Sequence, residues 1–240
     1  STKTQLGVDM VMLAAFELYG IGHTGALICL AAVSILMILR CRKDAHSAHA
    51  KSSLLLLTFC CFAAYPINQA AWESAGGAIT LDAVIPLHLC DIAAFLCGFA
   101  LITRRALLCE LAYFWGLAGT LQGLLTPNLP YDFPHPVFIA FFLQHGVVVI
   151  TALLLPLGLG WRPRSGAWYK SFAWLLGYAV IAFFANMALN TNFGFLMQKP
   201  SEASLIDLMP PWPFYILLMI CIAGLMFYLL GLPFRKSCQK

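Results

Sequence analysis

The apolar stretch VIPLHLCDIAAF, residues 84–95, contains three side chains that could do chemistry. They are His88, Cys90 and Asp91, which lie within four consecutive residues. A cysteine beside a histidine can become a thiolate-like nucleophile, and the histidine can later protonate a leaving group. His88 lies about 200° round a helix from Cys90, at roughly 100° per residue. It is therefore poorly placed to activate Cys90. The base must come from another helix, and His145 in the stretch FFLQHG is the candidate.

Other polar side chains occur in neighbouring apolar stretches at a similar predicted depth. Polar groups are costly inside a bilayer, so they usually mark helix interiors and sites. Cys90 is expected about eight residues, or roughly 12 Å, inside its helix. The shared depth predicts one polar chamber that opens towards the outer leaflet or external water, and the alternative is hydrogen bonding between helices. The residues expected to bind substrate there are His23, His88, Gln122, Gln144, Asn186, Asn190 and Asn192.

The elements that must position these residues are predicted to be membrane-spanning helices. The chain has 240 residues, of which 61% are hydrophobic and only 10% are charged, against roughly 25% charged in a soluble domain. A spanning helix needs roughly 20 mainly apolar residues, and seven runs qualify. They are residues 18–39, 52–72, 83–102, 106–126, 134–157, 168–189 and 212–232. We expect a single all-α domain over residues 1–240, with no cleavable signal peptide.

The orientation follows from the basic residues, of which the chain has fourteen. Two of them, Lys3 and Lys199, fall on one side of the predicted helices, and the other twelve fall in loops on the other side. By the positive-inside rule the amino terminus is outside and the carboxyl terminus is cytoplasmic, in what we expect to be a bacterial cytoplasmic membrane. The basic residues are spread over short loops, so the net charge of +4 does not indicate a nucleic-acid partner.

The nine cysteines give no disulfide or metal pattern. None falls in a predicted external loop, and no Cys-x-x-Cys spacing occurs. His23, His88, His145 and Asp91 could bind a metal by ligand type, but no spacing argues for it. We therefore expect neither a metal nor a cofactor.

At this point the residues resemble the YwaF-like bacterial integral membrane proteins, which are similar to animal transmembrane protein 164. The resemblance covers almost the whole chain and implies a lipid acyltransferase, distantly akin to multipass lipid hydrolases. Carried over by motif, the catalytic cysteine falls on Cys90 and the histidine on His145. The matching features are His23, IPLHLCD at 85–91, LLTPNLPYDFP at 124–134, His145 in FFLQHG, NMALNTNFGFLMQKP at 186–200 and PPWPFY at 210–215.

The resulting prediction is an intramembrane acyltransferase or lipid hydrolase with Cys90, His145 and Asp91 as catalytic residues. Its partners are membrane lipids as acyl donor and acceptor, and amides of Asn186, Asn190 or Asn192 could form the oxyanion hole. The alternative is a proton-coupled transporter that uses Asp91 and the histidines. A retinal-binding receptor of the usual kind is excluded, because the run 212–232 has no lysine.

Overall fold

The computed structural model describes residues 14–76, 80–200 and 205–238, and within these residues the chain is helical, with one isolated β-bridge between Ala15 and Tyr131. Among the described residues, five helices are long and apolar enough to cross a membrane, which fits an integral membrane protein. They are α2 (Ile21–Asp44), α3 (Ala48–Ser74), α8 (Pro136–Leu157), α9 (Ala167–Leu189) and α10 (Phe214–Gly231). Each overlaps a run that the sequence predicts.

The other two predicted runs fold differently from uninterrupted spanning helices. Residues 106–125 form α6 (Ala106–Trp115), a π-helical turn η1 (Gly116–Thr120) and α7 (Leu121–Leu125). The prediction of one helix over residues 83–102 is wrong at its start. A short α4 (Leu81–Val84) comes first, and α5 (Leu89–Thr103) begins only after an extended segment. The cause is Pro86, because the residue before a proline disfavours the helical region, and Ile85 is extended with φ −93° and ψ 120°.

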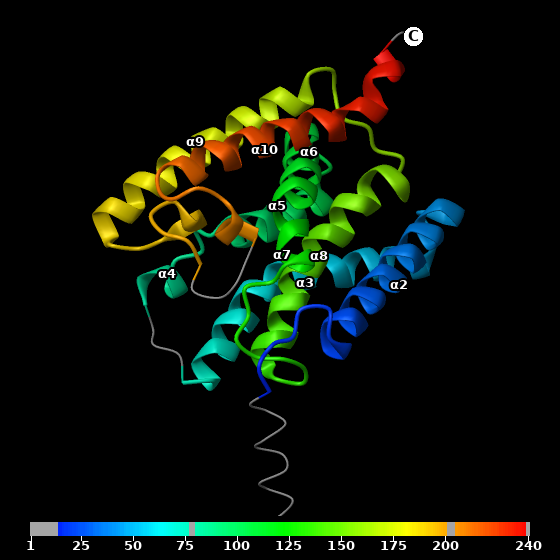
Figure 1. Cartoon of the computed structure of the whole chain (residues 1–240). Coiled ribbons are helices and arrows are strands. Elements are labelled where there is room, and N and C mark those ends of the chain that lie inside the picture. The colour runs from blue at the N-terminus through cyan, green and yellow to red at the C-terminus, as the bar shows by residue number, and fades with distance from the viewer. Residues whose placement is uncertain (1–13, 77–79, 201–204, 239–240) are drawn as a thin grey trace, which may run out of the picture.

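Helix α8 is the central helix of the bundle. Within its most apolar stretch 78% of the residues are buried, against 11–22% in the other four long helices. It packs against α2, α3, α5 and α6. Figure 1 shows α9 and α10 side by side on one side of the bundle and α2 on the other. The outer helices expose large apolar side chains such as Phe59, Trp174 and Phe184, which suits a surface that faces lipid.

An ion pair between buried Glu110 and partly exposed Arg164 fixes the loop between α8 and α9. Glu110 of α6 has no exposed surface, and its carboxylate accepts hydrogen bonds from Arg164 Nε at 2.9 Å and Nη2 at 2.7 Å. The Arg164 backbone N–H donates to the same carboxylate at 3.0 Å. The hydrogen bonds with Glu110, and its charge, raise the pKa of Arg164 above its ordinary value. The loop is therefore held on α6 by a two-pronged contact, the geometry in which arginine binds carboxylates best.

Candidate functional site

The first turn of α5 carries the three residues that opened the sequence analysis. His88 is the N-cap, Cys90 is the second helical residue, and Asp91 is the third. The Asp91 carboxylate accepts a hydrogen bond at 3.2 Å from the His88 backbone N–H, so it satisfies a donor that the helix start leaves free. The expectation that Cys90 lies eight residues inside a helix is wrong, because the extended segment at Pro86 delays the helix.

The Asp91 carboxylate also connects α5 to α8, the central helix of the bundle. Gln144 Nε2 of α8 donates a hydrogen bond to Asp91 Oδ1, and both side chains are buried. The Cys90 thiol also points to this oxygen, with the sulfur 3.9 Å away. Cys90, Asp91 and Gln144 thus form one short polar chain inside apolar packing, where hydrogen bonds are strong and an unpaired group is costly.

His145 is the next residue along α8. Among the described residues, its ring nitrogen Nδ1 has a hydrogen-bond partner and Nε2 has none. Its Nδ1 lies 3.0 Å from the Phe141 carbonyl oxygen. A carbonyl only accepts, so Nδ1 carries the proton and Nε2 has the free lone pair. The ring stacks on Phe141, with 3.9 Å between centroids. It also lies against Gly123 of α7, where a Cβ would stand 2.8 Å from His145 Cδ2 and 3.0 Å from Nε2.

The structure brings Cys90 and His145 onto packed helices without joining them. They are the neighbours in sequence of Asp91 and Gln144, whose contact links α5 to α8. Over the described residues, no hydrogen bond runs from the Cys90 sulfur to His145. The predicted nucleophile–base pair therefore shares one region of the bundle, and its direct contact stays a prediction.

The segment that follows α9 covers the start of α5. The His88 ring packs on Phe193 and Phe195, with centroids 5.4 and 6.0 Å apart. The Asn186 side chain fixes the conformation of this segment through hydrogen bonds to its backbone. Its side chain accepts from the Phe193 N–H at 2.7 Å and donates to the Phe193 carbonyl at 3.0 Å. Asn192 likewise accepts from the N–H groups of residues 197 and 198, and its Nδ2 donates to the Gln198 carbonyl at 2.9 Å. These two amides shape the covering loop, which leaves them poorly available as oxyanion donors.

A cavity of about 580 Å³ lies beside this covering segment. Its lining includes Asp82, Asn186, Asn190 and Asn192, but neither Cys90 nor His145. Asn190 is exposed and ends α9 in the left-handed conformation, with φ 55°. The asparagines therefore gather at a cavity of their own, separate from the polar chain of Cys90, Asp91 and Gln144.

Two further predicted residues are engaged elsewhere. His23 is fully buried. It accepts from the Tyr19 N–H through Nδ1 at 3.0 Å, and its Nε2 lies 2.8 Å from the Leu124 carbonyl oxygen. Both nitrogens are used, so His23 ties the start of α2 to the end of α7. Gln122 points to the Met226 sulfur of α10, at 3.9 Å. Over the described residues, no three His, Cys, Asp or Glu side chains gather as a metal site would require.

Sequence reasoning missed two residues that shape this region. Tyr178 of α9 is buried, and its hydroxyl donates to the Leu87 carbonyl at 3.1 Å, just before the α5 N-cap. Gly123 leaves the space that the His145 ring occupies. A tyrosine in the middle of an apolar helix, and a glycine one residue after Gln122, were the available signals.

Comparisons with known proteins place the chain. The model of the TMEM164 family matches residues 18–231. An uncharacterized protein of Treponema pallidum (strain Nichols) is 30% identical over 162 residues, which cover 64% of this chain and 63% of that protein's length. No solved structure is a significant match.

Proposed function

Because the chain belongs to the TMEM164 family over residues 18–231, we propose that it is a membrane-embedded acyl-transfer enzyme that acts on lipid esters. Cys90 is its nucleophile and His145 its general base. One observation carries the proposal. Cys90 lies in the first turn of a helix that the Asp91–Gln144 hydrogen bond fixes to α8, and α8 carries His145 with a free Nε2.

These two side chains carry the acyl group and the proton through the reaction. His145 Nε2 takes the thiol proton as the Cys90 sulfur attacks the ester carbonyl carbon of the donor lipid. The ester C–O bond breaks, and the departing alkoxide takes the proton from His145. The acyl group is then a thioester on Cys90. Water or a lysolipid hydroxyl attacks this thioester, gives its proton to His145, and releases the sulfur, which recovers that proton.

The first turn of α5 also supports the oxyanion that forms on the attacked carbonyl. The N–H groups at the start of an α-helix lack intrahelical acceptors, and the positive end of the helix dipole lies there. The side chains of Asn186 and Asn192 are occupied in the covering loop. We therefore assign the oxyanion hole to backbone N–H groups of this first turn, in place of Asn186 and Asn192.

Catalysis requires Cys90 and His145 to approach each other. Catalytic hydrogen bonds are often long or unformed before substrate binds. The Asp91–Gln144 contact keeps the two helices in register, so rotation of the two side chains is the motion that the reaction needs. The wider arrangement that we propose is seven spans, with α5 and the α6–α7 segment as the two beyond the five long helices. The amino terminus lies outside a bacterial cytoplasmic membrane, and the site opens towards the outer leaflet.

Lipid turnover by purified protein in liposomes tests this function. Free fatty acid and newly acylated lipid are measured for the wild type and for Cys90→Ala, Cys90→Ser and His145→Ala. Cys97→Ala is the matched control, because Cys97 lies two turns further along the same helix and is buried. We expect turnover to disappear in Cys90→Ala, to fall almost as far in the other two site variants, and to persist in Cys97→Ala. Wild-type turnover by Cys90→Ala would remove the covalent mechanism.

A further inference from the structure

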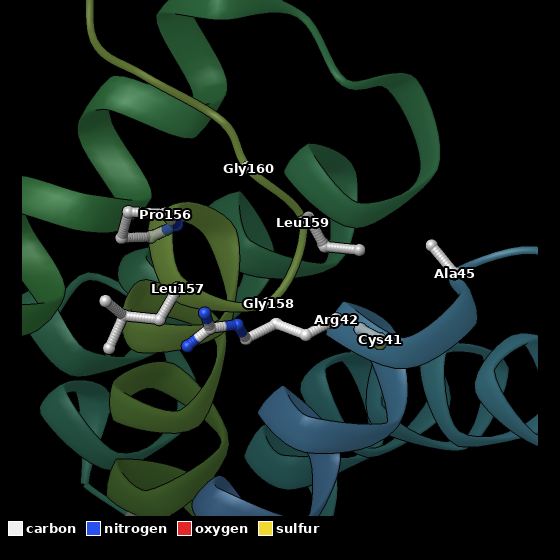
Figure 2. Close-up of a pocket in the computed structure, with 8 residues that line it drawn as sticks. All are labelled: Cys41, Arg42, Ala45, Pro156, Leu157, Gly158, Leu159 and Gly160. Atoms are coloured by element: carbon white, nitrogen blue, oxygen red, sulfur yellow. The ribbon is translucent and has the colours of Figure 1, made fainter.

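A second cavity lies at the far end of α8, away from Cys90. Its volume is about 540 Å³, and it is lined by Cys41 and Arg42 of the last turn of α2, by the C-cap residue Ala45, and by residues 156–160. Figure 2 shows Arg42 extending from α2 towards the end of α8, with Leu157 and Gly158 close to it. The cavity is therefore a space between two helix ends, entered by one cationic side chain.

Two glycines, Gly158 and Gly160, lie in the lining of this cavity. At Gly158 a Cβ would stand 2.6 Å from Leu154 Cδ1 and 3.3 Å from Ile38 Cα, so α2 approaches the end of α8 closely there. The chain then turns at Gly160, whose φ of +66° favours glycine. A Cβ at Gly160 would meet nothing within 4 Å. The helices thus touch at Gly158, and the connecting chain departs just beyond it.

Arg42 is the charged residue of this lining, and it has no partner for its charge among the residues that the structure describes. Two other arginines of the described residues have partners. Arg40 donates to Ser53 at 3.3 Å, and Arg164 is paired with Glu110. An unpaired guanidinium at a cavity between helix ends favours an anionic ligand.

We propose that this cavity binds the phosphate group of an anionic membrane phospholipid, with the Arg42 guanidinium as its main contact. Guanidinium groups match phosphate oxygens in a two-pronged geometry. Basic pockets between membrane helices are known hosts for such headgroups. A lipid fits better than a soluble phosphate, because Leu157 lines the cavity, is 52% exposed and offers an apolar surface to acyl chains. This site does not depend on the chemistry at Cys90.

Binding is tested with purified protein in detergent, using phosphatidylglycerol as the probe. Phosphatidylcholine serves as the zwitterionic control, and inorganic phosphate serves as the soluble one. The readouts are the rise in unfolding temperature on lipid addition and the lipid retained in native mass spectrometry. Arg42→Gln removes the charge, Ala45→Trp fills the cavity without changing charge, and Arg40→Gln is the control for charge alone on the same helix.

We expect phosphatidylglycerol to stabilise the wild type and Arg40→Gln, with little effect of phosphatidylcholine or inorganic phosphate. Arg42→Gln should weaken phosphatidylglycerol binding about fivefold, and Ala45→Trp should abolish the shift. The proposal is overturned if Arg40→Gln loses as much binding as Arg42→Gln, since that would be a surface-charge effect. It is also overturned if inorganic phosphate alone gives the shift. An Arg42→Gln protein that unfolds earlier yet keeps its full lipid-dependent shift would likewise overturn it, by reducing Arg42 to a partner of the α8 carbonyl end.

Discussion

The Gln144 side-chain amide donates a hydrogen bond to the buried Asp91 carboxylate, and this contact joins α8 to the first turn of α5. The same carboxylate accepts a hydrogen bond from the His88 N–H, so it caps the start of α5 and also connects that helix to α8. Cys90 and His145 flank the two partners in sequence. One polar contact therefore sets the relative position of the proposed nucleophile and its base.

Gln144→Leu should destabilise the protein by about 1–3 kcal/mol, because it leaves Asp91 buried without its strongest side-chain donor. Gln122→Leu is the matched control, since the Gln122 side-chain amide points to the Met226 sulfur at 3.9 Å and is partly buried. Thermal unfolding in detergent compares the two variants. Equal losses would show that the Asp91–Gln144 contact has no special structural role.

Gly123→Ala should reduce lipid turnover by on the order of tenfold or more while the protein stays folded. A Cβ at this position would stand 2.8 Å from the His145 ring, so the ring must move away from its present place. Small displacements of a catalytic group are costly to rate. Gly177→Ala in α9 is the control, because a Cβ there meets nothing within 4 Å. Turnover assays and unfolding curves are needed for both variants. Unchanged turnover in Gly123→Ala would mean that the ring position does not matter.

Arg164→Ala should lower the unfolding temperature more than Glu110→Gln does. Removing Arg164 leaves the fully buried Glu110 carboxylate without its countercharge. Removing the charge of Glu110 leaves an arginine side chain that is 57% exposed and can be hydrated. Adding Glu110→Gln to Arg164→Ala should therefore restore part of the lost stability. A double variant that is less stable than Arg164→Ala would contradict this account of the pair.

The long helices were predictable from the sequence, because length and apolar composition are enough to find them. Predicted runs 52–72 and 168–189 correspond to α3 (Ala48–Ser74) and α9 (Ala167–Leu189). The start of α5 was not predictable by the same means. The residues around Pro86 are as apolar as a spanning helix, although their backbone is extended. Apolar composition indicates which residues can lie in a membrane, but it does not show where the helix begins, which here depends on Pro86.

The site was predictable only in its residue types. Asp91, Gln144 and His145 stood out because polar groups are costly in a bilayer, but periodicity does not say which helix faces which. Asn186 and Asn192 show the consequence. Their amides looked like substrate contacts, and the structure places them in hydrogen bonds within the loop that covers His88. His23 is similarly committed to the backbone at Tyr19 and Leu124.

The proposed orientation predicts opposite labelling at the two ends of α3. His49 and Thr80 are exposed, and they lie near its start and beyond its end. In intact cells or spheroplasts, an impermeant thiol reagent should label Thr80→Cys and should reach His49→Cys only after lysis. Labelling of the unmodified protein sets the background from the native cysteines. Strong labelling of His49→Cys before lysis, with none of Thr80→Cys, would reverse the orientation.

The covalent step at Cys90 is tested most directly by mapping the acyl group itself. Purified protein is incubated with a lipid ester, quenched in acid, and digested for peptide mass spectrometry with and without hydroxylamine, which cleaves thioesters. The account predicts a hydroxylamine-sensitive acyl adduct on Cys90 and on none of the other eight cysteines, with far less adduct in His145→Ala. Lipid turnover with no acyl group on Cys90, or adducts spread over exposed cysteines such as Cys29 and Cys221, would contradict it.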